Sequence, residues 1–197
     1  MKLAIFPGTF NPIHIAHLLL AETARYQFNL DLIYFIPSNI PPHRHTGIAD
    51  ARHRFNMVDL SCQNNPFFKP SEIELKREGP SYTYDTLIKA KEVYPDLDEL
   101  FMIIGADAIR QLHTWHNCQN IVDITHFLVA NRPDNPDIKQ CLQETNLNNF
   151  KISIINSPLM EISSTLVRAN ITRGYSIKFL VDDLVREYIH QNDLYRE

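Results

Sequence analysis

Two histidines that lie three residues apart, His14 and His17, have the types and the spacing to handle phosphate. They follow an apolar run at residues 3–6, which ends before Gly8 and predicts a short strand. The apolar residues that come next recur at helical spacing, so both histidines fall at a strand-to-helix turn. Side chains at this spacing share one helix face, and a first turn offers free N–H groups and partial positive charge to an anion. Gly8 and Thr9 can bring backbone and hydroxyl to the same anion.

A second polar group lies near the far end of the sequence, at residues 162–168. Ser163 or Ser164 would cap a helix, so that hydroxyls, N–H groups and the Arg168 guanidinium converge on phosphate oxygens. Taken alone, this segment could be a plain capped helix with a solvated arginine, and the two histidines could have polar or packing roles. A metal site at the histidines is not favoured, because no third ligand is evident.

The segment Gly8-Thr9-Phe10-Asn11-Pro12-Ile13-His14-Ile15-Ala16-His17 resembles the GTFDPxHxGH signature of the nucleotidylyltransferase superfamily. Residues 162–168 resemble the ISSTxxR motif of the same superfamily. The resemblance implies that the paired histidines stabilise a triphosphate during adenylyl transfer. It also implies that the catalytic residues are His14, His17 and Arg168. Asn11 stands where the family often has aspartate, and Ala16 where it has glycine.

Further segments narrow the resemblance, over essentially the whole chain, to nicotinate mononucleotide adenylyltransferase. Residues 79–87 resemble the family's SYTxxTL segment, and residues 103–107 resemble its IGxD strand end. The ATP-binding residues that the resemblance implies are Gly8, Thr9, Phe10, His14, His17, Gly105, Asp107, Ser163, Ser164, Thr165 and Arg168. The implied acceptor-binding residues are Asn11, Arg44, Ser81, Tyr82, Thr83, Asp107, Trp115 and Arg132.

Several of the acceptor-binding residues have a specific chemical role in this interpretation. Tyr82 and Thr83, at a helix start, are placed to read the nicotinate carboxylate. The indole of Trp115, the single tryptophan, can stack on a pyridine ring, and Asp107 can accept hydrogen bonds from ribose hydroxyls. Arg44 stands where the family typically has lysine. The following helix carries Arg52 and Arg54, which could add further charge for phosphate.

The implied reaction joins nicotinate mononucleotide to the adenylyl group of ATP and releases pyrophosphate, with Mg²⁺ bound through the ATP phosphates rather than by the protein. Nicotinamide mononucleotide and phosphopantetheine remain alternative acceptors. A fragment of an aminoacyl-tRNA synthetase is disfavoured by the acidic balance, the short length and the absence of a KMSKS-like loop. A non-catalytic nucleotide sensor on the same fold is a third alternative.

An alternation of strands and helices has to position these residues. Apolar runs predict strands at 3–6, 32–36, 67–75, 100–104, 127–130 and 152–155. Helical spacing predicts helices at 16–28, 49–62 and 83–93, short helices at 108–122, a helix at 138–147, and helices that begin at 164 and 177. This alternation is typical of a parallel sheet covered on both faces, so we predict a doubly wound, Rossmann-like α/β fold. We expect one domain, 1–197, whose C-terminal helical part, about 163–197, packs on the sheet.

The composition limits the partners and the compartment. A formal net charge of −4 gives no general attraction to nucleic acid. No signal segment or membrane span is evident, and three widely spaced cysteines suit reduced thiols. We therefore expect a cytoplasmic protein whose partners are ATP and nicotinate mononucleotide, with no nucleic acid and no membrane. The sequence leaves a homo-oligomer open.

Overall fold

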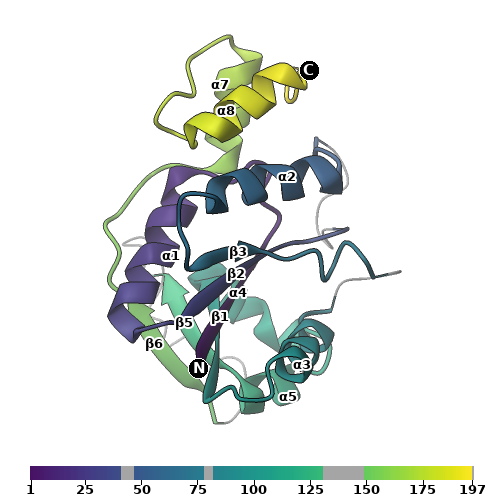
Figure 1. Cartoon of the computed structure of the whole chain (residues 1–197), viewed down its shortest axis with the longest axis vertical. Helices are drawn as coiled ribbons and strands as arrows, with labels where there is room; N and C mark the ends of the chain where they lie inside the picture. The colour runs from purple at the N-terminus through teal and green to yellow at the C-terminus, as the bar shows by residue number, and fades with distance from the viewer. Residues whose placement is uncertain (41–46, 78–81, 131–148, 197) are drawn as a thin grey trace.

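A computed structural model describes residues 1–40, 47–77, 82–130 and 149–196 of the chain. Its strands form one parallel sheet of six, in the order β3-β2-β1-β4-β5-β6 (Figure 1). Their bounds are β1 (Lys2–Gly8), β2 (Leu32–Pro37), β3 (Phe68–Pro70), β4 (Glu99–Gly105), β5 (His126–Ala130) and β6 (Lys151–Ile155). This arrangement confirms the predicted doubly wound α/β fold.

Helices follow most of the strands, as predicted. Their bounds are α1 (Ile15–Phe28), α2 (Ala51–Cys62), α3 (Thr83–Val93), α4 (Ala106–Gln111), the 3₁₀ helix η1 (Leu112–Thr114), α5 (Cys118–Ile124), α7 (Ser164–Thr172) and α8 (Asp183–Gln191). The helix predicted at 138–147 lies outside the described residues. No helix in the described part of the chain is long and apolar enough to cross a membrane.

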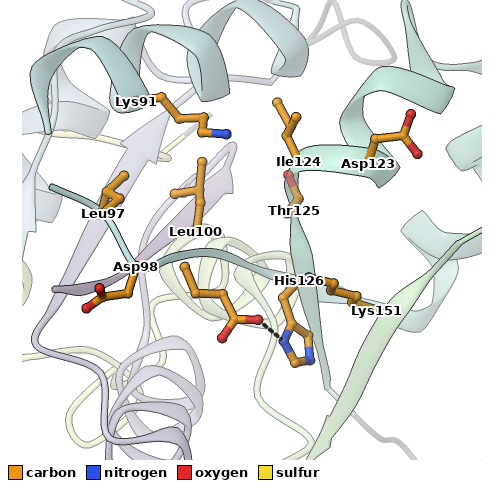
Figure 2. A pocket seen from close by; sticks show the side chains of 10 residues that line it. Lys91, Leu97, Asp98, Leu100, Asp123, Ile124, Thr125, His126 and Lys151 are labelled. Carbon is orange, nitrogen blue, oxygen red and sulfur yellow. Dashed lines mark hydrogen bonds and ion pairs between the residues drawn. The ribbon is translucent and has the colours of Figure 1, made fainter. Parts of the chain in front are cut away.

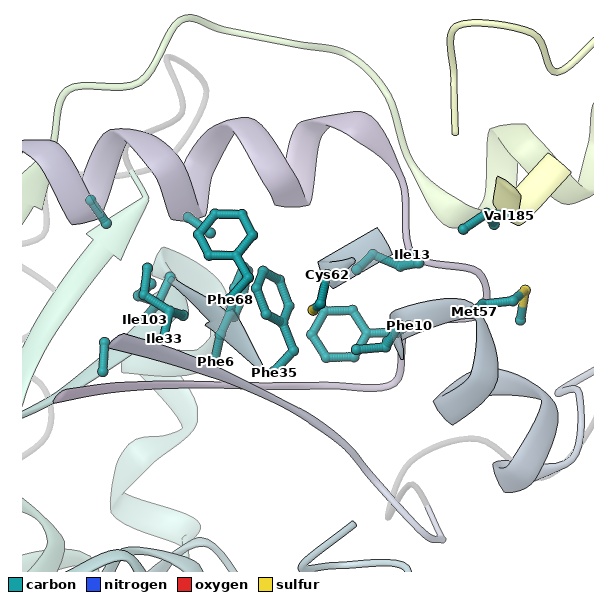
Figure 3. Close-up of a cluster of buried hydrophobic side chains, with 14 of the residues drawn as sticks. Phe6, Phe10, Ile13, Ile33, Phe35, Met57, Cys62, Phe68, Ile103 and Val185 are labelled. Carbon is teal, nitrogen blue, oxygen red and sulfur yellow. The ribbon is translucent and has the colours of Figure 1, made fainter. Parts of the chain in front are cut away.

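The strands are buried on both faces because their alternate side chains enter two different clusters. In β1, Ala4 and Phe6 belong to the cluster beneath α1 and α2, part of which Figure 3 shows. Leu3 and Ile5 point to the opposite cluster, beneath α3, α4 and α5. All four side chains are at most 6% exposed. A strand buried on both faces has to be apolar at every position, which explains the continuous apolar runs of the sequence.

The order of the strands creates a switch point between β1 and β4. From β1 the chain moves outward through β2 to β3, and it then crosses back to place β4 on the other side of β1. Ile5 pairs with Met102, so the carboxyl ends of both strands, Gly8 and Gly105, lie at the same edge. In open α/β sheets, ligands bind outside the carboxyl ends of the strands at such a point.

The C-terminal helices lie at this same end of the molecule, next to α2 (Figure 1). Val167 of α7 and Val185 and Ile189 of α8 are buried and join the cluster beneath α1 and α2. The main contacts of α8 are with α2. The C-terminal part therefore reaches the sheet through α2 and the first loop.

Two predicted boundaries were wrong by several residues. Strand β3 ends at Pro70 instead of residue 75, because the chain turns at residues 72–77, where Lys76 N–H donates to the Glu72 carbonyl. The last helix begins at Asp183 instead of 177. Phe179 adopts a left-handed conformation (φ 68°) that interrupts a helix, and the Asp182 carboxylate accepts from Leu184 N–H and caps the new start.

Candidate active site

The histidine loop, residues 8–17, connects β1 to α1 at the switch point. Phe10 within it has a left-handed backbone (φ 47°), which costs a residue with a side chain about 1–2 kcal/mol. Its ring is buried and packs edge-on against Phe6 with centroids 5.6 Å apart. A Cβ at position 8 would lie 2.9 Å from that ring, so Gly8 is required where the loop folds over it. The Phe10 ring thus lies buried beneath the loop and forms its floor. Only the Phe10 backbone can contact a ligand.

His14 and His17 are brought together at the start of α1, as their spacing predicts. His14 occupies the N-cap position with extended backbone, and its N–H donates to Nδ1 of His17 at 3.2 Å. The two rings stack with centroids 3.6 Å apart. His17 also rests edge-on against the Phe10 ring, at 5.1 Å between centroids. The buried floor therefore fixes the orientation of both imidazoles.

The second motif joins the histidine loop, although the two are 152 positions apart in the sequence. Ser164 Oγ donates to the Pro12 carbonyl at 2.8 Å. Arg168 Nη1 donates to the Asn11 carbonyl at 2.8 Å, while its Nη2 lies 3.4 Å from Thr165 Oγ1. The Ser163 hydroxyl accepts from Leu166 N–H and caps α7. The structure thereby places the starts of α1 and α7, with their positive ends, side by side.

Asn11, which is 2% exposed, uses its side chain to tie three segments together. Its Oδ1 accepts from Ala49 N–H at 3.0 Å and from the Tyr195 hydroxyl at 2.8 Å. Its Nδ2 donates to the Gly47 carbonyl at 3.0 Å. Burial raises the pKa of the Tyr195 phenol, and the nearby Arg168 guanidinium lowers it by a smaller amount. These contacts suit an amide, because a carboxylate could not donate to Gly47.

The arginines of α2 do not have the position that we expected from the sequence. Arg54 is 1% exposed, and its guanidinium donates to the backbone carbonyls of Thr9, Asn39 and Ala49. Arg52 instead forms an exposed ion pair with Glu72. Arg54 is thus buried beneath the loop and cannot contact a phosphate. Sequence reasoning missed its role because nothing in the helical pattern marks one arginine as buried.

The predicted acceptor residues gather on the other side of the switch point, around α3 and α4. Gly105 and Asp107 are exposed where β4 passes into α4. Thr83 is the first residue of α3, and the preceding Tyr82 is 42% exposed. The Tyr82 ring lies 4.5 Å from that of His116, the neighbour of Trp115. The helix start and the tryptophan segment therefore lie close together, with Trp115 half-buried against the second cluster.

Three of the predicted acceptor residues, Arg44, Ser81 and Arg132, lie outside the described residues. Among the residues that are described, no group of three His, Cys, Asp or Glu side chains comes together as a cation site. The histidine loop and the start of α7 offer N–H, hydroxyl and guanidinium donors instead. Such donors can bind phosphate oxygens. They cannot coordinate Mg²⁺ themselves, so the ion would enter the site bound to the phosphates.

A cavity of about 200 Å³ lies at the opposite edge of the sheet, where β4, β5 and β6 begin (Figure 2). Its lining includes Lys91, Asp123 and Lys151, and His126, whose Nδ1 is 2.8 Å from Glu99 Oε1. None of the residues singled out in the sequence lines it. Because ligands of open α/β sheets bind at the carboxyl ends of strands, this cavity is not the candidate active site.

Comparisons with known proteins show the family to which the chain belongs. A model of the cytidylyltransferase-like family matches residues 5–170. The nicotinate-nucleotide adenylyltransferase of Bacillus subtilis (strain 168) is 37% identical over 199 residues, which cover 98% of this chain and 98% of that protein.

Solved structures show the same fold. Two structures of nicotinic acid mononucleotide adenylyltransferase from Plasmodium falciparum, complexed with NaAD and with APC, superpose with TM-scores of 0.79 and 0.78. Both alignments cover 98% of this chain, with 97% and 96% of those chains, at 23% and 22% identity. The full-length similarity and the family model together establish that this chain belongs to the cytidylyltransferase-like family and, within it, to the nicotinate-nucleotide adenylyltransferases.

Proposed function

We propose that this protein transfers the adenylyl group of ATP to nicotinate mononucleotide, which yields nicotinate adenine dinucleotide and pyrophosphate, a step of NAD biosynthesis. The observation that carries the proposal is the junction of the histidine loop with the start of α7, where Ser164 Oγ donates to the Pro12 carbonyl at 2.8 Å. This junction gathers two helix N-termini, two imidazoles and a guanidinium at the switch point. Such a donor set is suited to a triphosphate.

The reaction needs no nucleophile from the protein. The 5′-phosphate of the mononucleotide is already an anion at neutral pH, so one of its oxygens attacks the α-phosphorus of ATP directly. A new P–O bond forms as the bond to the bridging oxygen of the β-phosphate breaks, and pyrophosphate leaves with that electron pair. Catalysis therefore reduces to holding two substrates in line and neutralising charge on the phosphate oxygens.

His14 and His17 are the residues that hold the triphosphate in this proposal. The His17 ring accepts the His14 N–H at Nδ1, so a neutral His17 carries its proton on Nε2. A protonated Nε2 can donate to a phosphate oxygen. Arg168, with Ser163, Ser164 and Thr165 at the start of α7, grips the leaving phosphates. The backbone of Gly8, Thr9 and Phe10 completes the ATP side, and Gly105 and Asp107 face it across the switch point.

The acceptor lies over α3 and α4. The N–H groups at the start of α3 and the Thr83 hydroxyl bind the nicotinate carboxylate, with Tyr82 beside it. Ser81 stays a predicted acceptor-binding residue. Trp115 stacks on the pyridine ring, and Asp107 accepts from the ribose. Arg44 and Arg132 supply charge for the acceptor phosphate. Asn11, which we expected to contact the acceptor directly, acts through the loop, because its side chain is committed to backbone and Tyr195.

Mg²⁺, bound through the ATP phosphates, would neutralise charge on the phosphate oxygens and make pyrophosphate a better leaving group. The cytoplasmic location also remains a prediction, and the oligomeric state stays open.

An experiment with labelled ATP tests which bond is broken. The protein is incubated with Mg²⁺, nicotinate mononucleotide and ATP that carries ³²P at the α-position or at the γ-position. We expect the α-label in the dinucleotide and the γ-label in pyrophosphate. Release of the γ-label as inorganic phosphate would rule out adenylyl transfer. Nucleotide binding without turnover would favour a sensor.

A further inference from the structure

Arg54 is the largest side chain that the protein buries completely among the described residues, with 1% of its surface exposed. It stands in the first turn of α2, and burial lowers the pKa of its guanidinium. Its hydrogen-bond partners are backbone carbonyls. The Asp50 and Glu74 carboxylates attract the guanidinium, but they raise its pKa by less than burial lowers it. Because three backbone carbonyls accept its hydrogen bonds, this arginine also ties segments of the backbone together.

Its three hydrogen bonds reach three separate segments around the switch point. Nη1 donates to the Thr9 carbonyl in the histidine loop at 2.8 Å. Nη2 donates to the Asn39 carbonyl, just after β2, at 3.0 Å. Nε donates to the Ala49 carbonyl, just before α2, at 2.9 Å. The planar fork of a guanidinium can make these three bonds at once, whereas a lysine ammonium is a single point.

The contact with Thr9 is made next to the left-handed residue of the histidine loop. Phe10 has the left-handed backbone, and the carbonyls of the residues before and after it both accept hydrogen bonds from arginines. Arg54 holds the Thr9 carbonyl from below, and Arg168 holds the Asn11 carbonyl from α7. A residue in this sparsely populated conformation persists only where its surroundings fix it. The Phe10 ring beneath His17 depends on the same backbone.

We propose that Arg54 is a positioning residue for adenylyl transfer: by fixing the Thr9 carbonyl it holds Phe10, and through Phe10 the imidazole of His17, in the geometry that the reaction needs. The inference rests on the proposed function. Arg54 does not touch a substrate. Its removal shifts the loop, and a shift of about 1 Å in a reacting geometry costs about 100-fold in rate.

The test compares Arg54→Lys and Arg54→Met with the wild-type protein. Both variants are assayed for pyrophosphate release from ATP and nicotinate mononucleotide, at a temperature where circular dichroism shows each to be folded. We expect kcat to fall at least 10-fold in both, because neither can hold three carbonyls. The KM for nicotinate mononucleotide should change less than threefold, because Thr83, Asp107 and Trp115, which bind its nicotinate and ribose in the proposed function, lie around α3 and α4. If Arg54→Met does not fold, Arg54→Lys alone decides.

Arg25→Met is the matched structural control. Arg25 lies in α1, where it pairs with Glu22 at 2.6 Å and stacks over Phe67, so its loss affects packing at a distance from the histidine loop. This variant should lose stability and keep its kcat. The proposal is overturned if either Arg54 variant is folded and keeps kcat within threefold of wild type, or if Arg25→Met loses kcat as much as the Arg54 variants do. Absence of turnover in the wild-type protein would instead contradict the proposed function.

Discussion

The imidazole rings of His14 and His17 stack with their centroids 3.6 Å apart and their planes 24° from parallel, and the N–H of His14 donates to Nδ1 of His17. Because that nitrogen accepts a hydrogen bond, the tautomer that fits places the His17 proton on Nε2. The pair is thus oriented by contacts with the protein itself, namely the His14 backbone and the Phe10 ring. Preorganised donors of this kind are effective because they need not rearrange during the reaction.

The first prediction concerns the distal nitrogen of His17. His17→Asn can keep an acceptor for the His14 N–H but lacks the distal donor, and His17→Ala lacks both. We expect each to lower kcat by about 100-fold or more, with little change in folding. The exposed His190→Ala, in α8, is the control and should have the wild-type rate. An unaltered steady-state rate in both His17 variants would exclude the proposed role.

The second prediction concerns the choice of acceptor. Thr83→Ala removes a hydroxyl at the start of α3, while Thr83→Ser keeps it. A hydrogen bond to a charged group contributes about 1.5–3 kcal/mol, so the preference for nicotinate over nicotinamide mononucleotide should fall about 10-fold or more in Thr83→Ala. The ratio of the two kcat/KM values measures this preference. If Thr83→Ala retains the wild-type ratio, the Thr83 hydroxyl does not bind the nicotinate carboxylate.

The third prediction concerns Arg168, whose Nη1 holds the Asn11 carbonyl. Arg168→Lys keeps the positive charge but loses the planar guanidinium. Its ammonium can therefore bind either the Asn11 carbonyl or a phosphate, but not both. We expect kcat/KM for ATP to fall about 10-fold or more, as is usual when a charge-assisted hydrogen bond is lost. The exposed Arg173→Lys, at the end of α7, should leave kcat/KM unchanged. Equal values for the two variants would contradict the role of Arg168.

The fourth prediction concerns the stability of the protein in alkali. Burial raises the pKa of the Tyr195 phenol, while an unfolded phenol ionises near pH 10. Above about pH 10 the unfolded state therefore binds fewer protons than the folded state, and the contribution of Tyr195 to stability is lost as the pH rises.

Urea unfolding of the wild-type protein and of Tyr195→Phe measures this contribution. At pH 8 the variant should be less stable by about 1 kcal/mol, because the hydrogen bond to Asn11 Oδ1 is missing. At pH 11 the difference should shrink, since phenylalanine does not ionise. The other buried tyrosine and cysteine side chains are common to both proteins and cancel. A difference that stays constant between pH 8 and pH 11 would show that the phenol is not buried as described.

The sequence predicted the central elements of the fold because their signals are local. The apolar run of β1 and the helical spacing of α1 are both set by residues within a few positions of each other. The end of β3 and the start of α8 were missed, because each depends on a turn. Glu72 accepts from Lys76 N–H in the first, and the left-handed Phe179 interrupts the chain in the second.

The site divides in the same way. The sequence predicted that His14, His17 and Ser164 lie at helix starts, because polar residues before a helical run have a recognisable pattern. Their role in the site came from the resemblance to a known family. The positions of Arg54 and Tyr195 could not be predicted in either way. An arginine in a helix and a tyrosine near the chain end are ordinarily exposed, and these two are placed by carbonyls and an amide from distant segments. Such contacts exist only once the fold has formed.

The most direct test of the central claim measures pyrophosphate release from ATP with Mg²⁺ and three acceptors at matched concentrations: nicotinate mononucleotide, nicotinamide mononucleotide and phosphopantetheine. We expect nicotinate mononucleotide to give the highest kcat/KM, by about 10-fold or more over its amide, in line with one charge-assisted hydrogen bond. Equal rates with the amide would contradict the proposal that Thr83 binds the nicotinate carboxylate, but they would still be consistent with adenylyl transfer. No turnover with any of the three would contradict the assignment of this chain as an adenylyltransferase.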